Sequence, residues 1–246
     1  MMTILMSLLS ILSMITGLFA FSYAINLAVC GEKEGSVPIK GREKTSANDE
    51  KRIIKPITVF TSLDLEMAQP SKKIIQIGAC VGDISTGEIL EKLSVFINPH
   101  EQLSQEIIKL TGIKQEDVDN GVSLEEGYEL LRDMHERHES FINPIAWGGG
   151  DSVELLAQLQ KENPNFQGWC FGRRWIDVKT LFVSWRFANG RPIQGGLAKS
   201  MLKVGLAFSG RKHNATDDSI NTFRVYVKML ELFKKIDPTP KESADQ

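Results

Sequence analysis

The chain has 246 residues, of which 42% are hydrophobic and 24% charged, and its formal net charge is −2. This composition fits one folded domain of ordinary size together with additional segments. The near-neutral balance excludes a uniformly basic nucleic-acid-binding protein, so any phosphate-binding surface must be local or depend on a metal. The cysteines Cys30, Cys80 and Cys170 lie far apart and form neither a zinc signature nor an evident disulfide framework.

The first segment, residues 1–30, carries no charged side chain and is longer than the roughly 20 apolar residues that cross a bilayer. Lysines and arginines follow between residues 33 and 52, which favours a membrane anchor whose following domain stays in the cytoplasm. Two alternatives remain open. One is a cleaved signal peptide that ends at Ala24, with export of the protein, and the other is a misassigned start that leaves a soluble cytoplasmic protein.

Two polar segments flank the predicted folded domain. Residues 31–53 are charged and show no periodicity, which indicates a flexible linker. Residues 237–246 have the same character and indicate a disordered tail. The folded domain is therefore expected at 54–236.

The domain opens with an alternating segment from Ile57 to Leu63, which predicts a strand buried on at least one face. Asp64 and Glu66 follow at its end, and the strand period of two places both carboxylates on one face. Crowded negative charge of this kind requires protons or a cation, and a divalent metal such as Mg²⁺ suits hard carboxylate oxygens. A polar strand end that enters a loop is the alternative for these two residues alone.

Two more strands are expected at 74–83 and 92–99, joined through a hairpin-like turn at 83–87. Three consecutive strands with short connections predict an antiparallel meander. A short helix should follow and stop at Gly112. A stronger amphipathic helix is expected from Ser123 to Glu136, with Ser123 as its N-cap in a capping box.

A short apolar strand at 145–147 runs into three glycines, then Asp151, then a helix with an apolar stripe. Asp151 therefore lies at a junction between strand and helix. A helix N-cap is one interpretation of this aspartate. The glycines favour another, because they would let a ligand or a second chain approach the backbone closely.

The last region predicts two helices around a loop. His213 and Asp218 are five residues apart, a rotation of about 140° in a helix, so they would not share a helical face. We therefore expect His213 to precede the helix and Asp218 to lie in its first turn, where both can meet one ligand. A polar surface cluster is the alternative for this stretch alone.

The three acidic motifs, taken in order, resemble the DEDDh branch of the DEDD exonuclease superfamily. Asp64 and Glu66 match the first motif, Asp151 the second, and His213 with Asp218 the third. The segments WGGGD and 197–218 are most similar to the histone-mRNA and small-RNA 3′-end exonucleases. The resemblance covers about residues 54–236.

The resemblance implies an α/β fold with a ribonuclease-H-like mixed sheet, in which an antiparallel three-strand meander is extended by parallel strands and flanked by helices. It also implies a metal-dependent 3′–5′ exonuclease that releases nucleoside monophosphates from single-stranded ends, with RNA favoured over DNA. Two alternatives stay open: a DNA 3′–5′ exonuclease of the proofreading or repair type, and a catalytically weak nucleic-acid-binding protein that keeps the fold.

The resemblance further implies roles for individual residues. Asp64 would bridge two Mg²⁺ ions, which Mn²⁺ can replace, while Glu66 and Asp218 hold the first ion and Asp151 helps to place the second. His213 would accept the proton of the attacking water. Contacts to the 3′-terminal part of the RNA or DNA strand are implied for Leu65, Met67, Thr111, Gly112, Ile113, Arg211 and Lys212. For the two basic residues, solvated loop cations are the alternative.

Overall fold

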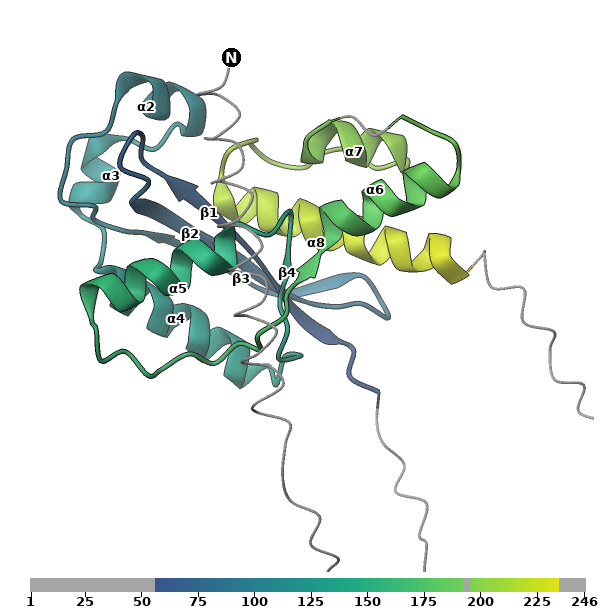
Figure 1. Cartoon of the computed structure of the whole chain (residues 1–246), viewed down its shortest axis with the longest axis horizontal. Coiled ribbons are helices and arrows are strands. Elements are labelled where there is room, and N and C mark those ends of the chain that lie inside the picture. Colours follow the sequence, from purple (N-terminus) through teal and green to yellow (C-terminus); the bar gives the residue numbers. More distant parts are fainter. Residues whose placement is uncertain (1–55, 193–194, 235–246) are drawn as a thin grey trace, which may run out of the picture. The chain divides into compact units, whose positions relative to one another are not determined.

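The computed structural model describes residues 56–192 and 195–234 (Figure 1). The chain divides into two units, Met1–Ile53 and Ile54–Gln246. The predicted anchor at 1–30, the linker at 31–53 and the tail at 237–246 lie outside the described residues. Among the residues that are described, no helix combines the length and the apolar character that crossing a membrane requires.

The centre of the domain is a five-stranded sheet with the order β3-β2-β1-β4-β5. Strands β1, β2 and β3 form antiparallel pairs, whereas β4 pairs parallel to β1 and β5 pairs parallel to β4. This arrangement confirms the predicted meander and mixed sheet. The strands are β1 Val59–Met67, β2 Ile74–Asp83, β3 Glu88–Phe96, β4 Ile145–Ala146 and β5 Ile176–Asp177.

β1 continues to Met67, so Asp64 and Glu66 lie inside the strand and not after its end, and β4 is one residue shorter than predicted. The other two differences concern β3 and β5. β3 begins at Glu88 and not at residue 92, because the turn closes tightly where the Gly87 amide donates to the Asp83 carbonyl at 2.7 Å. The sequence analysis also did not anticipate β5. A strand of two residues is too short to show a period, and its pairing with β4 defines it.

Seven helices are described around this sheet. The predicted capping box is present: the Ser123 hydroxyl accepts from the Glu126 amide at 3.2 Å, and the Ser123 amide donates to the Glu126 carboxylate at 2.9 Å. The predicted stop at Gly112 is also present, in a left-handed conformation with φ 72°. The helices are α2 Gln105–Thr111, α3 Gln115–Asp119, α4 Leu124–Arg137, α5 Asp151–Glu162, α6 Val178–Ala188, α7 Leu197–Lys203 and α8 Ala215–Lys234.

Helices cover both faces of the sheet, with α4 and α5 on one side and α6, α7 and α8 on the other (Figure 1). Alternation along β1 divides its side chains between these layers: Leu63 and Leu65 enter the core with α4 and α5, while Phe60 packs with α8. Because Asp64 and Glu66 alternate with these leucines, both carboxylates lie on the α8 side. The strand therefore delivers its acidic pair beneath the start of α8.

Candidate active site

Four carboxylates from three separate parts of the chain meet near the C-terminal end of the central strand, β1. Asp64 and Glu66 come from β1, Asp151 is the first residue of α5, and Asp218 lies in the first turn of α8. Each of Asp151, Asp218 and Glu66 acts electrostatically on Asp64, and Asp151 has the largest effect of the three. All four are partly buried. The structure thus brings together the acidic residues that the motifs predict.

A close approach between α8 and β2 places Asp218. Gly78 lies opposite Asp64 in the β1–β2 register, and a β-carbon at Gly78 would overlap with the backbone of Ala215. The Ala215 amide donates to the buried Gln76 side chain at 3.1 Å. Only a residue without a side chain lets the helix start so near the strand. Glycine at 78 and glutamine at 76 therefore fix the beginning of α8 above Asp64.

Gln76 is a further residue of the site that was not predicted, although the sequence carries a signal for it. This side chain is fully buried, and it stands within the apolar run of β2. A buried amide requires partners. Gln76 finds them in the Ala215 amide and in the hydroxyl of Ser94, to which its own nitrogen donates at 3.1 Å. Its role is to satisfy a helix N-terminus that packs on the sheet.

Asp151 does not act as a helix cap. Gly150 occupies the N-cap position of α5, so the aspartate side chain remains available to the site. The glycines before it have open space around them: apart from the adjacent residues of the chain, nothing in the described residues comes within 4 Å of a β-carbon built at Gly148, Gly149 or Gly150. The Gly148 amide donates to Asp177 at 3.1 Å, which ties this turn to the end of β5.

His213 precedes α8 as predicted, and its backbone has the left-handed φ of 58°. Its amide donates to the Asp218 carboxylate at 3.1 Å. One potential ligand atom from each of Glu66, His213 and Asp218 lies within 4.8 Å of the others. The imidazole therefore lies at the Glu66–Asp218 side of the carboxylate group, and it is exposed to solvent.

The carboxylates resist ionisation. Burial, and then repulsion from Asp151, Asp218 and Glu66, raises the pKa of Asp64 well above its usual range. Burial is also the largest cause that raises the pKa of Glu66 and Asp151 to about 7 and of Asp218 to about 6. A fully ionised group of this kind is unfavourable without positive charge nearby. The donor set therefore suits a divalent cation with oxygen ligands.

The residues predicted to contact the substrate differ in how buried they are and in which face of the sheet they lie on. Leu65 is buried in the core on the face opposite the carboxylates, and Met67 is partly buried at the end of β1. Thr111 and Ile113 are buried, and the threonine hydroxyl bonds within its own turn, donating to the Ile107 carbonyl and accepting from the Ile113 amide. Gly112 lies against the guanidinium group of Arg211, which belongs to the His213 loop.

A small cavity of about 230 Å³ adjoins His213. Lys212 lines it, and so do Lys199 of α7 and Phe208, which the sequence analysis did not single out. No local pattern marks these two residues, because α7 and the His213 loop become neighbours only through packing against α8. Other predicted residues in its lining are His213 and Asp218.

Residues 60–226 match the family model described as Exonuclease. The chain is 29% identical over 181 residues to ERI1 exoribonuclease 2 of Homo sapiens, covering 65% of this chain and 26% of that protein. It is 28% identical over 222 residues to the 3′-5′ exonuclease Snipper of Drosophila melanogaster, covering 79% and 76%. The chain thus spans about a quarter of the length of the first of these relatives.

Two solved structures share the architecture. The nuclease domain of 3′hExo bound to rAMP aligns with a TM-score of 0.61 at 24% identity, covering 71% of this chain and 92% of that one. Cell-death related nuclease 4 aligns with a TM-score of 0.63 at 20% identity, covering 72% and 65%. These likenesses confirm the predicted mixed-sheet fold.

Proposed function

Because this chain belongs to the exonuclease family, whose model spans residues 60–226, we propose that it is a metal-dependent 3′–5′ exonuclease acting on single-stranded ends. The observation that carries the proposal is the meeting of Asp64, Glu66, Asp151 and Asp218 beside His213. RNA is the favoured substrate, since one similar protein is named an exoribonuclease. The products are nucleoside 5′-monophosphates.

Mg²⁺ is the metal that we propose, with Mn²⁺ able to replace it. Asp64, Glu66 and Asp218 would hold one ion, and Asp64 with Asp151 a second. The raised pKa values of these groups support the fit, because a bound cation compensates charges that burial makes unfavourable. When bound, such metals offset the charge of the phosphate oxygens and acidify a water.

His213 is the proposed proton acceptor. Its imidazole takes a proton from the water whose oxygen attacks phosphorus, while the bond from phosphorus to O3′ of the preceding nucleotide breaks and O3′ takes a proton from solvent water. The Asp218 carboxylate accepts from the His213 amide and so holds the loop beside the acidic group. Solvent exposure of the imidazole lets it pass the proton on to bulk water.

The proposal is tested with the full-length protein, Mg²⁺ and body-labelled single-stranded RNA and DNA of one sequence. We expect nucleoside 5′-monophosphates released stepwise from the 3′ end, faster from RNA. Asp64→Asn should abolish release, whereas Asp133→Asn, on an exposed position of α4, should not. Binding without release would favour the catalytically weak alternative, and faster release from DNA the DNA exonuclease.

We also propose that residues 1–30 attach the protein to a membrane and leave the nuclease domain in the cytoplasm. The uncharged segment and the basic residues after it support this proposal. This segment lies outside the described residues.

A further inference from the structure

We infer that a groove along α5 receives the unpaired nucleotides on the 5′ side of the cleaved bond. This inference rests on the proposed function and deepens it, since it identifies a binding site for the strand outside the carboxylate group. The groove is a cavity of about 470 Å³ between α5 and the loop that follows it. Its lining residues are Ser152, Val153, Leu156, Ala157, Gln160, Trp169, Gly172, Arg173 and Trp175.

The groove begins next to the proposed site. Ser152 directly follows Asp151, and Val153, Leu156 and Gln160 continue along one side of α5 with helical spacing. From Ser152 to Gln160 the helix rises about 12 Å. Val153 is 65% exposed, so its side chain is accessible from the groove. A strand that leaves the carboxylates past Asp151 therefore meets an apolar surface at once.

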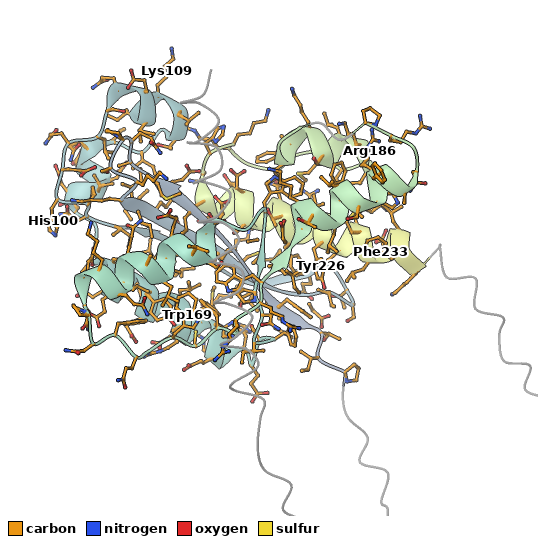
Figure 2. The ribbon with its side chains drawn as sticks, in the orientation of Figure 1. His100, Lys109, Trp169, Arg186, Tyr226 and Phe233 are labelled. Carbon is orange, nitrogen blue, oxygen red and sulfur yellow. The ribbon has the colours of Figure 1, made fainter. Side chains whose placement is uncertain are left out.

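Stacked aromatic rings form the opposite wall. The rings of Trp169 and Trp175 are 6.4 Å apart with an angle of 18°, and Trp169 stacks on Tyr128 at 5.7 Å and 3°. Phe171 packs edge-on against both tryptophans. The Tyr128 hydroxyl accepts from the Cys170 amide at 2.8 Å, which ties the loop to α4. Figure 2 shows Trp169 on the α4 and α5 side of the sheet. The wall is held in place before any ligand arrives.

The direction of the strand follows from the chemistry of displacement at phosphorus. The attacking and leaving oxygens lie roughly in line. His213 marks the attacking side, with Glu66 and Asp218 around it. Asp151 comes from the opposite helical layer, as the first residue of α5. The leaving O3′, with the rest of the strand, should therefore point toward Asp151 and the open backbone at 148–150.

The lining suits a single strand. Trp169 and Trp175 are only partly buried, so the parts of their rings that line the groove can contact unpaired bases of any sequence, and a positive side chain complements the phosphates between them. Arg173 supplies that charge, and it is exposed. A base that is paired in a duplex cannot offer its face to an indole, so the groove selects unpaired nucleotides. The proposed occupant is thus the unpaired strand on the 5′ side of the cleaved bond.

A charge placed in the groove tests the inference. Val153→Glu in the full-length protein puts a carboxylate on an exposed position of the groove, and Phe187→Glu on α6, where the side chain is 74% exposed, is the matched control. A second pair consists of Arg173→Ala and Arg174→Ala, because both arginines are exposed but only Arg173 lines the groove.

Two substrates separate the groove from the chemistry. One is the p-nitrophenyl ester of uridine 5′-monophosphate, which has no nucleotide on the 5′ side, and the other is a single-stranded RNA octamer. We expect Val153→Glu and Arg173→Ala to raise KM for the octamer by about tenfold, because the first places a negative charge beside the phosphates and the second removes a positive one. Hydrolysis of the ester should be unchanged, and both controls should behave as wild type.

Equal loss on both substrates would overturn the inference, because the variants would then act on the carboxylate group itself. No change on the octamer would also overturn it. If the wild-type protein hydrolyses neither substrate, the proposed function fails. Fluorescence anisotropy of a labelled octamer then still tests whether the groove binds the strand. The inference requires Val153→Glu to bind the octamer about tenfold more weakly than Phe187→Glu does.

Discussion

The guanidinium group of Arg211 covers the α-carbon of Gly112, so that a β-carbon at position 112 would overlap with it. This contact joins the turn after α2, which the family resemblance assigns to the 3′ end of the substrate, with the loop that carries His213. The loop is held from its other side as well, because the Arg211 amide donates to Asp217 at 2.8 Å. Arg211 therefore spans two walls of the proposed site.

Gly112→Ala should displace this guanidinium group. We expect KM for RNA to rise, and stability to fall by about 1–2 kcal/mol because the left-handed backbone disfavours a β-carbon. Gly190→Ala is the matched control, since Gly190 has a φ of 61° but open space around it within the described residues. It should have the same stability cost and an unchanged KM. If Gly112→Ala raises KM further in an Arg211→Ala background, the effect does not run through the guanidinium group.

Gly78→Ala should destabilise the domain more severely. The new methyl group would meet the backbone of Ala215, which cannot move without shifting the start of α8. We expect the free energy of unfolding to fall by about 3 kcal/mol or more. Activity should also be lost, because Asp218 moves away from Asp64. Thermal unfolding and RNA hydrolysis measure the two effects. Gly196→Ala, at an open position of ordinary backbone conformation, should change neither stability nor fold, and wild-type behaviour of Gly78→Ala would contradict the close approach.

The metal-free protein should lose stability as the pH rises. A carboxyl group whose pKa is raised in the folded state stabilises the fold below its unfolded pKa, and this contribution is lost as the pH rises through the folded value. Glu66 and Asp151 have folded pKa values of about 7. The loss should therefore extend from about pH 4 to about pH 8.

Thermal unfolding in EDTA and in Mg²⁺ across this range tests that expectation. His135 acts in the opposite sense, because burial lowers its pKa to about 4, so the informative quantity is the change in slope. Both Asp151→Asn and saturating Mg²⁺ should flatten the fall. Slopes that are identical in all three conditions would show that the carboxylates do not bind extra protons in the folded state.

His213→Ala should separate catalysis from metal binding. As a proton acceptor, His213 contributes roughly 10²–10⁴-fold to the rate. Metal affinity by calorimetry should be nearly unchanged, because the four carboxylates remain. His213 lies near Glu66 and Asp218, so it could also be a metal ligand. Loss of metal binding in His213→Ala would identify the histidine as a ligand and not as the proton acceptor.

Full-length protein should fractionate with membranes through residues 1–30, and a protein that begins near Lys51 should be soluble and equally active. The physical reason is the transfer of an uncharged apolar segment into the bilayer. Full-length protein recovered wholly in the soluble fraction, with its N-terminus intact, would contradict membrane attachment. A shortened protein outside the cytoplasm would identify a cleaved signal peptide instead.

Sequence alone determined the local features of this protein. Alternation and turn residues predicted the three-strand meander, the capping box predicted the start of α4, and the spacing of His213 and Asp218 placed one before α8 and the other inside it. These features depend on contacts within a few residues, so their signals are local as well. The acidic motifs also appear in order along the chain, and their resemblance to the motifs of the DEDDh exonucleases was enough to propose the five residues of the site.

Tertiary structure decided what depends on distant segments. β5 has two residues and is defined by its pairing with β4, so the sequence shows no alternation from which it could be predicted. The groove needs α5 and the tryptophan loop, and the support of α8 needs Gly78 opposite Asp64 with Ala215 above it. Such contacts arise where close packing brings distant segments together, and the local sequence of one segment does not show which other segment it will contact. That is why Asp64, Asp151 and Asp218 could be named from the sequence, while the path of a bound strand past Asp151 could be inferred only from the fold.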